Sequence, residues 1–458
     1  YDRHTLPDTP LADLIRIFLL RGELTGERLE AILDAHTIER LVSLGILIRS
    51  GDSICSGVDL FCSGGMLFAT DHRYMLKEDD KLSEDPVMYI GMDSHGLVQT
   101  APRESCGRLL DLCCGSGVQG LVGSRYAADV VAVDLNPRAI RFARFNAQLN
   151  GVRRYEVREG NLYQCVKGEK YDVILANPPF VPSPEMGLKF RDGGSNGEAI
   201  LREIVKGAAD HLSDTGRLCI VTDLVDIGGY PEKLRSWWGG SSMESLVLTT
   251  ADRDEILFSV PHCHAPFGQS LSQYNEELSR WVQNYREADL SGVNFGYILI
   301  QSNPSWGGES VTMRTVHNPA RPIHRQVSDW FEQRELWHSA NSETLFLGLH
   351  PDLRMRIEHS PGRQNPDFEV MVPDNDFFTT YVVGETIYKE LQRIYDVEPR
   401  LGTRLTPVDQ GWLEDLHRKG ILRLMRYRRG IETKALTRSE KDSLRVEEMA
   451  TKTTPTCL

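Results

Sequence analysis

The chain has 458 residues, of which 40% are hydrophobic and 26% charged, and a formal net charge of -13. This length exceeds one ordinary core, so two or three domains are expected. The acidic balance argues against broad, non-specific binding to nucleic acid, which depends on neutralising phosphates, and no apolar run is long enough to span a membrane.

The nine cysteines are scattered, without a CxxC pair or metal-type spacing, which favours reduced thiols in a cytoplasmic protein. His262-Cys263-His264 lacks a second ligand cluster, so no metal site is predicted. The chain begins with Tyr1 and has no signal-like start, which leaves open whether the native N-terminus is present.

Residues 1–85 are predicted to form a winged-helix-like N-terminal domain. Apolar residues at helical spacing between Leu11 and Leu19, a helix opening at Thr25 and a third helix ended by Gly45 precede a hairpin pattern. Winged helices commonly bind DNA, but the expected recognition helix has only Arg40 as a fixed positive charge. A docking or dimerisation role is therefore favoured.

Residues 86–303 are predicted to form a Rossmann-like α/β domain. Strands alternating with helices indicate a mainly parallel sheet that has helices on both faces. Seven strands are expected, at residues 108–112, 130–134, 155–157, 171–176, 217–221, 245–248 and 295–301.

Residues 304–436 are predicted to form an additional α+β region. From residue 376 onward, a helix followed by a strand-like run echoes the N-terminus, so a second winged-helix-like unit is expected there. One basic cluster comprises Arg423, Arg426, Arg428 and Arg429. A solvated strand face is favoured for it over an anion-binding site. The polar residues 437–458 are predicted to be a disordered tail.

The tetrapeptide Asn177-Pro178-Pro179-Phe180 follows the apolar run 171–176. Two prolines cannot continue a strand, so the chain leaves the sheet after Asn177, at the edge where open α/β sheets bind ligands. A side-chain amide and donor-poor backbone there can accept hydrogens from a substrate NH group, with Phe180 stacking on a flat group. The tetrapeptide is also readable as a turn, because Asn-Pro commonly opens one.

A glycine-rich turn, Cys113-Cys114-Gly115-Ser116-Gly117, follows the first strand, and Asp134 ends the second. Glycines in such a turn let the backbone approach a ligand closely. Asp134 is placed to accept hydrogen bonds from two ribose hydroxyls. Asn161, after the third strand, suits an adenine amino group. A GxGxxG pattern alone could indicate NAD, FAD or no ligand.

Asp111 discriminates between these cofactor classes. A dinucleotide brings a pyrophosphate to the first turn, which a carboxylate repels. A methionine-type cofactor brings an ammonium and a sulfonium, which a carboxylate attracts. Together with the Asn-Pro-Pro-Phe exit, Asp111 favours S-adenosylmethionine over NAD.

With these motifs the chain resembles class I methyltransferases of the Asn-Pro-Pro-aromatic branch. Residues 146–151, Asn-Ala-Gln-Leu-Asn-Gly, are similar to the "small-domain" methyltransferases, and Arg191 to Gly197 is similar to a segment of the release-factor glutamine methyltransferases. The resemblance covers about residues 100–225. It implies the usual seven-stranded methyltransferase sheet and S-adenosylmethionine as cofactor.

The resemblance also implies roles for single residues. Asp111, Gly115 and Gly117 would line the methionine end of the cofactor, and Asn177 would orient the nitrogen that is methylated. The implied cofactor site comprises Asp111, Cys113, Gly115, Gly117, Asp134, Leu135, Asn161, Leu162 and Asn177; the implied catalytic residues are Asn177, Pro178 and Phe180.

Three positions depart from the family pattern. Cys113 stands where the first glycine is usual, and Asn161 and Asn196 stand where acids are common. An amide oxygen still accepts from an amino group, so Asn161 remains compatible with adenine. The flanking regions differ from the small helical domain of the release-factor enzymes, so the resemblance does not imply that this chain shares their substrate.

Three functions stay open. The favoured one is N-methylation of a protein side-chain amide, glutamine or asparagine, with the flanking domains docking the protein. The second is methylation of a nucleobase amino group or of a small-molecule amine. The net charge disfavours a nucleic-acid substrate, whereas the basic cluster Arg423 to Arg429 is compatible with one. The third is a non-catalytic binding module, which the intact Asp111, Asp134 and Asn177 disfavour. The oligomeric state is not predicted.

Overall fold

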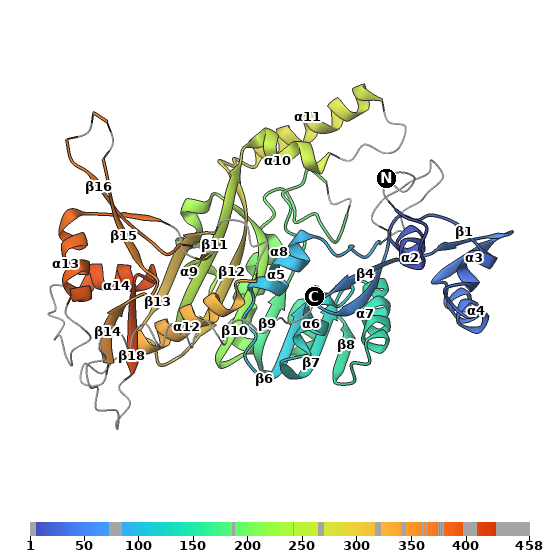
Figure 1. Cartoon of the computed structure of the whole chain (residues 1–458), viewed down its shortest axis with the longest axis horizontal. Coiled ribbons are helices and arrows are strands. Elements are labelled where there is room, and N and C mark those ends of the chain that lie inside the picture. Colours follow the sequence, from blue (N-terminus) through green and yellow to red (C-terminus); the bar gives the residue numbers. More distant parts are fainter. Residues whose placement is uncertain are drawn as a thin grey trace.

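One mixed β-sheet occupies the centre of the computed structural model, with smaller groups of elements at its two ends (Figure 1). The structure describes residues 6–72, 85–185, 188–240, 242–263, 270–316, 322–339, 345–359, 361–362, 364–373, 375, 377, 380–396 and 410–426. Among these residues, no helix combines the length and the apolar character needed to cross a membrane.

The central sheet has eight strands in the order β13-β11-β12-β10-β9-β6-β7-β8. In chain order they are β6 (Cys106–Leu112), β7 (Ala127–Asp134), β8 (Tyr155–Glu159), β9 (Tyr171–Ala176), β10 (Leu212–Val225), β11 (Met243–Arg253), β12 (Val293–Ser302) and β13 (Glu309–Thr315). Strands β8, β7, β6, β9 and β10 are parallel, β12 is antiparallel to both of its neighbours, and β13 is parallel to β11.

All seven predicted strands are present, but the sheet has eight strands, one more than predicted. The additional strand, β13, lies beyond the boundary predicted at residue 303, so the sheet extends into the region assigned to the C-terminal part. Apolar and polar residues alternate over Val311 to Arg314, and the polar members, Thr312 and Arg314, are buried while Val311 and Met313 are partly buried. The strand is held by its ladder with β11 at the sheet edge.

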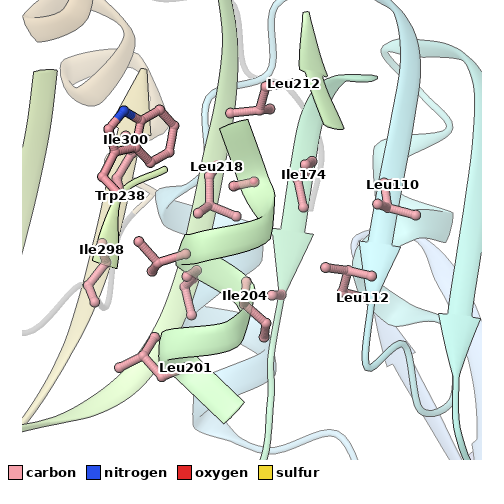
Figure 2. Packing of buried hydrophobic residues seen from close by; sticks show 14 of the residues in the cluster. Leu110, Leu112, Ile174, Leu201, Ile204, Leu212, Leu218, Trp238, Ile298 and Ile300 are labelled. Carbon is pink, nitrogen blue, oxygen red and sulfur yellow. The ribbon is translucent and has the colours of Figure 1, made fainter. Parts of the chain in front are cut away.

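Alternating side chains of the parallel strands enter two cores on opposite faces of the sheet, as the two-residue period of a strand requires. Leu110 and Ile174 face one core with α8 (Ala199–His211) and α9 (Tyr230–Trp237) (Figure 2). Leu109 and Leu175 face the other core, with α5 (Met92–Thr100) and α12 (His324–His338). Each fully buried leucine contributes about 1.5–3 kcal/mol through removal from water.

Helices α6 (Val118–Gly123) and α7 (Pro137–Leu149) follow β6 and β7, and the short η1 (Leu162–Val166) precedes β9. The hairpin β4 (Asp59–Ser63) and β5 (Met66–Thr70) packs beside α7, whose Asn146 accepts from the amide of Ala69 at 2.8 Å. Asn146 also donates to the carbonyl of Ser116 at 2.9 Å. The motif 146–151 therefore fastens this hairpin to the glycine-rich turn.

The N-terminal elements follow the predicted order of three helices and a hairpin. They are α2 (Pro10–Phe18), β1 (Leu24–Thr25), α3 (Gly26–Glu30), α4 (Ala35–Ser43), β2 (Leu47–Ser50) and β3 (Ser53–Ser56). Thr25 caps α3 by accepting from the amide of Arg28, as expected for a helix opening there. The winged-helix class of this domain stays a prediction.

The C-terminal part packs against α12 at the other end of the molecule (Figure 1). Its elements are β14 (Leu345–Leu349), β15 (Arg354–Glu358), β16 (Asp367–Met371), β17 (Tyr381–Val383), α13 (Glu385–Asp396), α14 (Gln410–Arg418) and β18 (Leu422–Arg426). Strand β18 pairs with β14, and β17 pairs with β16. The second winged-helix-like unit stays a prediction, and residues 437–458 lie outside the described residues.

Arg423 of the predicted basic cluster is half-buried and forms an ion pair with Asp329 of α12, at 2.8 Å between Nη1 and Oδ2. This pairing departs from the expectation of a solvated charge at that position. The side chains of Arg426, Arg428 and Arg429 lie outside the described residues.

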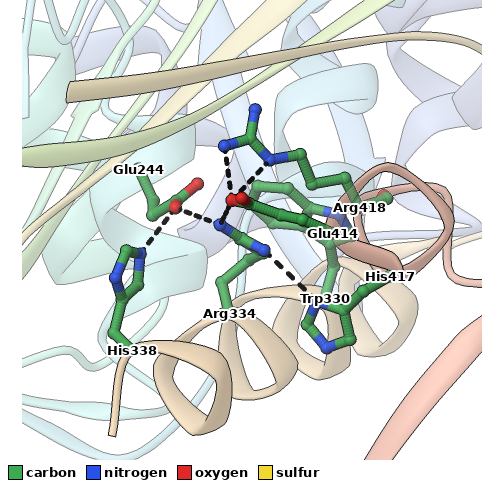
Figure 3. A network of polar contacts seen from close by, with 7 residues as sticks. All are labelled: Glu244, Trp330, Arg334, His338, Glu414, His417 and Arg418. Atoms are coloured by element: carbon green, nitrogen blue, oxygen red, sulfur yellow. Dashed lines mark hydrogen bonds and ion pairs between the residues drawn. The ribbon is translucent and has the colours of Figure 1, made fainter. Parts of the chain in front are cut away.

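A buried polar network joins the C-terminal part to the sheet (Figure 3). Arg334 of α12 donates to Glu244 of β11 at 2.6 Å, and both side chains are fully buried. Arg334 also contacts Glu414 and His417 of α14, and His338 lies 2.7 Å from the same Glu244 oxygen. One guanidinium thus links three elements that are distant in sequence.

Candidate functional site

The carboxyl ends of β6, β7, β8 and β9 meet at one edge of the sheet. Asp111 of β6 pairs with Leu175 of β9, and Leu112 pairs with Ala176, the residue before Asn177. The chain order reverses between β6 and β9, because β7 and β8 lie on one side of β6 and β9 lies on the other. Open α/β sheets bind ligands at such a switch point, so the two predicted motifs flank the expected crevice.

The glycine-rich turn is held to the second strand through Asp134. One oxygen of Asp134 accepts from the amide of Gly115 at 2.8 Å, and the other accepts from the amide of Asn136 at 2.8 Å. Gly115 has φ +54°, with no atom within 4 Å of the position of an added Cβ. At Gly117, φ is +85° and an added Cβ would lie 2.6 Å from the Tyr155 hydroxyl. The turn therefore presents bare backbone to open space at Gly115 and needs glycine for packing at Gly117.

Cys113 also adopts a left-handed conformation, with φ +56°. A non-glycine residue costs about 1–2 kcal/mol there, yet the backbone still follows a glycine-like path. The departure of Cys113 from the family pattern is thus accommodated by the chain conformation. Burial raises the pKa values of Cys113 and Cys114 above their ordinary range, so both thiols stay neutral.

Asp111 fits a cationic ligand. Its side chain is fully buried, and Oδ2 accepts from the amide of Gly120 at 2.7 Å. Its Oδ1 is buried and has no hydrogen-bond partner among the described residues. Burial, with a smaller effect of Asp134, raises the pKa of Asp111 to about 7. A buried acceptor without a donor, on the strand that leads into the glycine-rich turn, suits the positively charged methionine end of S-adenosylmethionine.

The affinity for S-adenosylmethionine is expected to fall by up to about tenfold for each pH unit below 7. Protonation of Asp111 below its raised pKa removes the negative charge that holds the cation. Titration calorimetry between pH 7.5 and 5.5 measures this dependence. Asp111→Asn should weaken the binding of S-adenosylmethionine and make its affinity less dependent on pH. A dissociation constant that is independent of pH in the unsubstituted protein would contradict this role of Asp111.

The remaining predicted cofactor residues line the same edge. Asp134 is half-buried, and burial raises its pKa. Leu135 is 64% exposed immediately after it. Asn161 is exposed at the start of η1, and Leu162 has φ +47° and packs partly against the core below. The structure places these side chains at the strand ends, while their contacts with the cofactor stay predictions.

Asn177 is held by α5. Its side-chain Nδ2 donates to Oδ2 of Asp93 at 2.8 Å and to the hydroxyl of Ser94 at 3.4 Å. Since a carboxylate only accepts, this contact turns the amide oxygen of Asn177 away from Asp93. Within the described residues, no donor pairs with that oxygen or with the carbonyl of the buried Pro178. Two acceptors on adjacent residues thus have no donor among the described residues.

Asp93 was not predicted from the sequence. It lies at the start of α5, where an acidic residue has the ordinary role of stabilising a helix terminus. Burial raises the pKa of Asp93 more than the hydrogen bond from Asn177 lowers it. The contact joins residues 84 positions apart, so no local pattern could reveal it.

Asp93→Ala is expected to reduce methyl transfer by about 10–100-fold, the scale known for orienting groups around metal sites, without changing the affinity for S-adenosylmethionine. The lost contact lets the Asn177 amide rotate. Asp93→Asn should restore most of the activity, because its oxygen can accept from Nδ2. Steady-state kinetics with both variants measure the effect, and equal losses in the two would argue against an orienting role.

Phe180 and the predicted segment 191–197 form one packed unit. Val181 bridges to Asp192, and the carbonyl of Val181 accepts from the amide of Gly193 at 2.9 Å. An added Cβ on Gly197 would lie 2.3 Å from the Phe180 carbonyl oxygen. The glycines of this segment thus allow it to lie directly against the strand exit, and Phe180 packs near Phe295, with ring centroids 6.4 Å apart.

No cluster of three or more histidine, cysteine or carboxylate side chains suited to a metal ion occurs in the described part of the chain. Cys263 of the predicted His-Cys-His run is buried and donates to the carbonyl of Ser259, while His264 lies outside the described residues.

Comparison with known families identifies two segments. Residues 90–239 match the methyltransferase small domain, and residues 2–57 match a domain of unknown function (DUF7059). The first match contains the strand ends, the glycine-rich turn and the Asn-Pro-Pro-Phe exit described above.

Two curated relatives are glutamine methyltransferases. The ribosomal protein uL3 glutamine methyltransferase of Bradyrhizobium diazoefficiens is 30% identical over 217 residues, 42% of this chain and 64% of that protein. The release factor glutamine methyltransferase of Cereibacter sphaeroides is 34% identical over 143 residues, 28% of this chain and 51% of that protein. Among solved structures, a ribosomal protein L11 methylase from Lactobacillus delbrueckii subsp. bulgaricus has a TM-score of 0.28 and 14% identity, covering 46% of this chain and 77% of that chain.

These matches confirm the predicted resemblance and a methyltransferase domain of the kind that uses S-adenosylmethionine. The chain covers less than two thirds of the length of either curated relative. Their substrates therefore do not transfer directly to this protein.

Proposed function

We propose that this protein, whose residues 90–239 match the methyltransferase small domain, transfers a methyl group from S-adenosylmethionine to a side-chain amide nitrogen of a protein, glutamine or asparagine. One observation carries the proposal. The amide oxygen of Asn177, turned outward by Asp93, and the carbonyl of Pro178 are adjacent acceptors at the strand end beside Asp111. Two acceptors match the two hydrogens of a planar NH2 group.

An amide nitrogen is a poor nucleophile because its lone pair is delocalised into the carbonyl. Acceptance of both N–H hydrogens by Asn177 and Pro178 would fix the plane of the amide and return electron density to nitrogen. S-adenosylmethionine, when bound, supplies an electrophilic methyl group on a sulfonium. Correct orientation of two reactants can contribute about 7–11 kcal/mol, so positioning by Asn177 and Asp93 is the main task of this site.

Protein is favoured over nucleic acid as the substrate. The segment 191–197, similar to that of release-factor glutamine methyltransferases, packs directly on the strand exit. The net charge is -13, and Arg423 of the basic cluster is already paired with Asp329. A protein with this acidic balance is poorly suited to neutralise phosphates.

The flanking regions are proposed to dock the protein substrate, the N-terminal one as a winged-helix-like domain. A cytoplasmic location is proposed as well. All eight cysteines within the described residues are unpaired thiols, which supports a reducing compartment.

The test is incubation of the purified protein with methyl-labelled S-adenosylmethionine and a whole-cell extract, which is then separated into protein, nucleic acid and small-molecule fractions. We expect the label in protein. Label in RNA or DNA would support the nucleobase alternative instead, and label in the small-molecule fraction would indicate an amine acceptor. The absence of transfer to every fraction would argue for a non-catalytic module.

A further inference from the structure

The connection between β11 and β12 carries two helices, α10 (Glu255–His262) and α11 (Leu271–Glu287), which stand beyond the edge of the sheet (Figure 1). Val225 at the end of β10 and Arg253 at the end of β11 pair with the same residue, Val293. The two helices therefore rise from the same edge of the sheet as Asn177, which follows β9, the parallel neighbour of β10.

Contacts tie this helical pair to the segment that packs on the strand exit. The guanidinium of Arg191 lies 5.0 Å from the ring centre of Trp281 and donates to the carbonyl of His262 at 3.4 Å. Asn284 donates to the carbonyl of Ser195 at 3.1 Å. The helical pair and the acceptor side of the site thus form one continuous surface.

Helix α10 has one buried and one exposed face. Phe258 is buried in a cluster with Trp281 and Tyr285 of α11. On the other face, Leu257 and Val260, three residues apart, are 60% and 41% exposed, and Ile256 is 49% exposed. This apolar face has no cover among the described residues.

An open hollow of about 480 Å³ adjoins this face. It is lined by Leu257 and by carboxylates at the ends of β10 and β11, namely Asp226, Asp252 and Asp254. The one cation in its lining, Arg253, is already paired with the buried Asp223. The hollow is therefore negatively charged, and Leu257 joins its lining to the exposed apolar face of α10.

We propose that this hollow and the exposed face of α10 bind a positively charged segment of the protein substrate. A lysine or arginine of the segment enters the hollow, and an apolar neighbour packs on Leu257 and Val260. This inference rests on the proposed function and names the class of substrate. Charge complementarity selects such a segment and excludes nucleic acid, whose phosphates the carboxylates would repel.

The spacing of the strands sets the distance between cation and target amide. The hollow begins at Asp226, one strand spacing from β9, and its middle and far side, at β12 and β11, lie two to three spacings from β9, or about 10–15 Å at 4.8 Å per spacing. An extended peptide covers this distance in about three to five residues. The preferred substrate is therefore expected to carry a basic residue three to five positions from its glutamine or asparagine.

The test uses synthetic peptides with one central glutamine and a single lysine placed one to six residues away, and a matched set with Ser in place of lysine. The variant protein carries Asp226→Asn, Asp252→Asn and Asp254→Asn together. Asparagine keeps the oxygens that accept from Ser291, from Asn294 and from the first amides of α10. Only the charge is removed, so folding should be preserved. Asp210→Asn, an exposed carboxylate at the opposite end of the sheet, is the control.

We expect the triple variant to lose about tenfold or more in kcat/KM for peptides with lysine at positions three to five, and none for the serine peptides. Its affinity for S-adenosylmethionine should match that of the unsubstituted protein. Equal rates of the triple variant and the unsubstituted protein on the lysine peptides, or an equal loss on both peptide sets, would overturn the inference while leaving the proposed function intact. Failure of the unsubstituted protein to methylate any protein in the extract would instead overturn the proposed function.

Discussion

Asn177→Ala is expected to reduce methyl transfer by about a hundredfold or more while leaving the affinity for S-adenosylmethionine within about threefold. The substitution removes one of the two acceptors that would orient the substrate nitrogen, whereas Asp111 of the neighbouring strand β6 and Gly115 of the turn after it are unchanged. Loss of a single preorganised polar group at a reacting centre reduces kcat by about a hundredfold to a thousandfold. Calorimetric titration and single-turnover transfer measure the two quantities separately.

Two further variants sharpen this prediction. Asn177→Asp keeps the shape of the side chain but brings a carboxylate within contact of Asp93, so it should reduce methyl transfer as well. Asn303→Ala, beyond the opposite edge of the sheet, should retain full activity. Full activity of Asn177→Ala, or a loss of cofactor binding equal to its loss of transfer, would be inconsistent with an orienting role.

Glu244→Ala is expected to destabilise the protein by up to about 3–5 kcal/mol, the cost of breaking a buried ion pair, because Arg334 then keeps only Glu414, at 3.1 Å, as a carboxylate partner. The variant removes the carboxylate that pairs with the fully buried Arg334 and also contacts His338 (Figure 3). Because Arg334 also holds α14, the C-terminal part should detach first. Chemical denaturation followed by tryptophan fluorescence measures the loss, since Trp330 and Trp337 lie on α12 beside the network.

Asp415→Ala is the matched control for Glu244→Ala. Asp415 pairs with Lys419 at 2.7 Å in the same region, but the Asp415 side chain is exposed and that of Lys419 is only half-buried. Exposed pairs of this kind contribute about 0–1 kcal/mol. Similar losses in the two variants would mean that the buried network has no special role in fastening the C-terminal part.

The same network predicts acid sensitivity of the C-terminal part. Burial, together with the nearby Arg334, lowers the pKa of His417 to about 3, well below its ordinary value of 6.5. The unfolded chain binds a proton on His417 more readily than the folded chain does. The contribution of His417 to the free energy of unfolding is therefore fully present above pH 6.5. It falls by at most about 1.4 kcal/mol per pH unit as the pH drops towards 3. Denaturation midpoints at pH 7.5 and 5 should differ accordingly, and His417→Gln should reduce the difference.

The features that could be predicted from the sequence are those with a local signal. The run 171–176 ends in two prolines, so its strand and the exit at Asn177 follow from backbone chemistry alone. The glycine-rich turn and Asp134 are likewise defined within a few residues of a strand. Parallel pairing then brings these ends together, which makes the crevice between β6 and β9 predictable.

The features that were missed depend on partners far along the chain. Asp93 acquires its role only when α5 packs beside the strand exit, and β13 becomes a strand only through its ladder with β11. Helix α12 buries Arg334, a residue that sequence patterns place on a surface. Its buried environment comes from Glu244 and Glu414, which lie 90 and 80 positions away.

Mass spectrometry of the labelled protein product tests the central claim most directly. After transfer from methyl-labelled S-adenosylmethionine, fragmentation of the modified peptide locates the methyl group on one side chain. The geometry of Asn177 and Pro178 predicts a methyl group on the side-chain amide nitrogen of a glutamine or asparagine. A methyl group on lysine, arginine, a carboxylate or a nucleobase would contradict the proposed function.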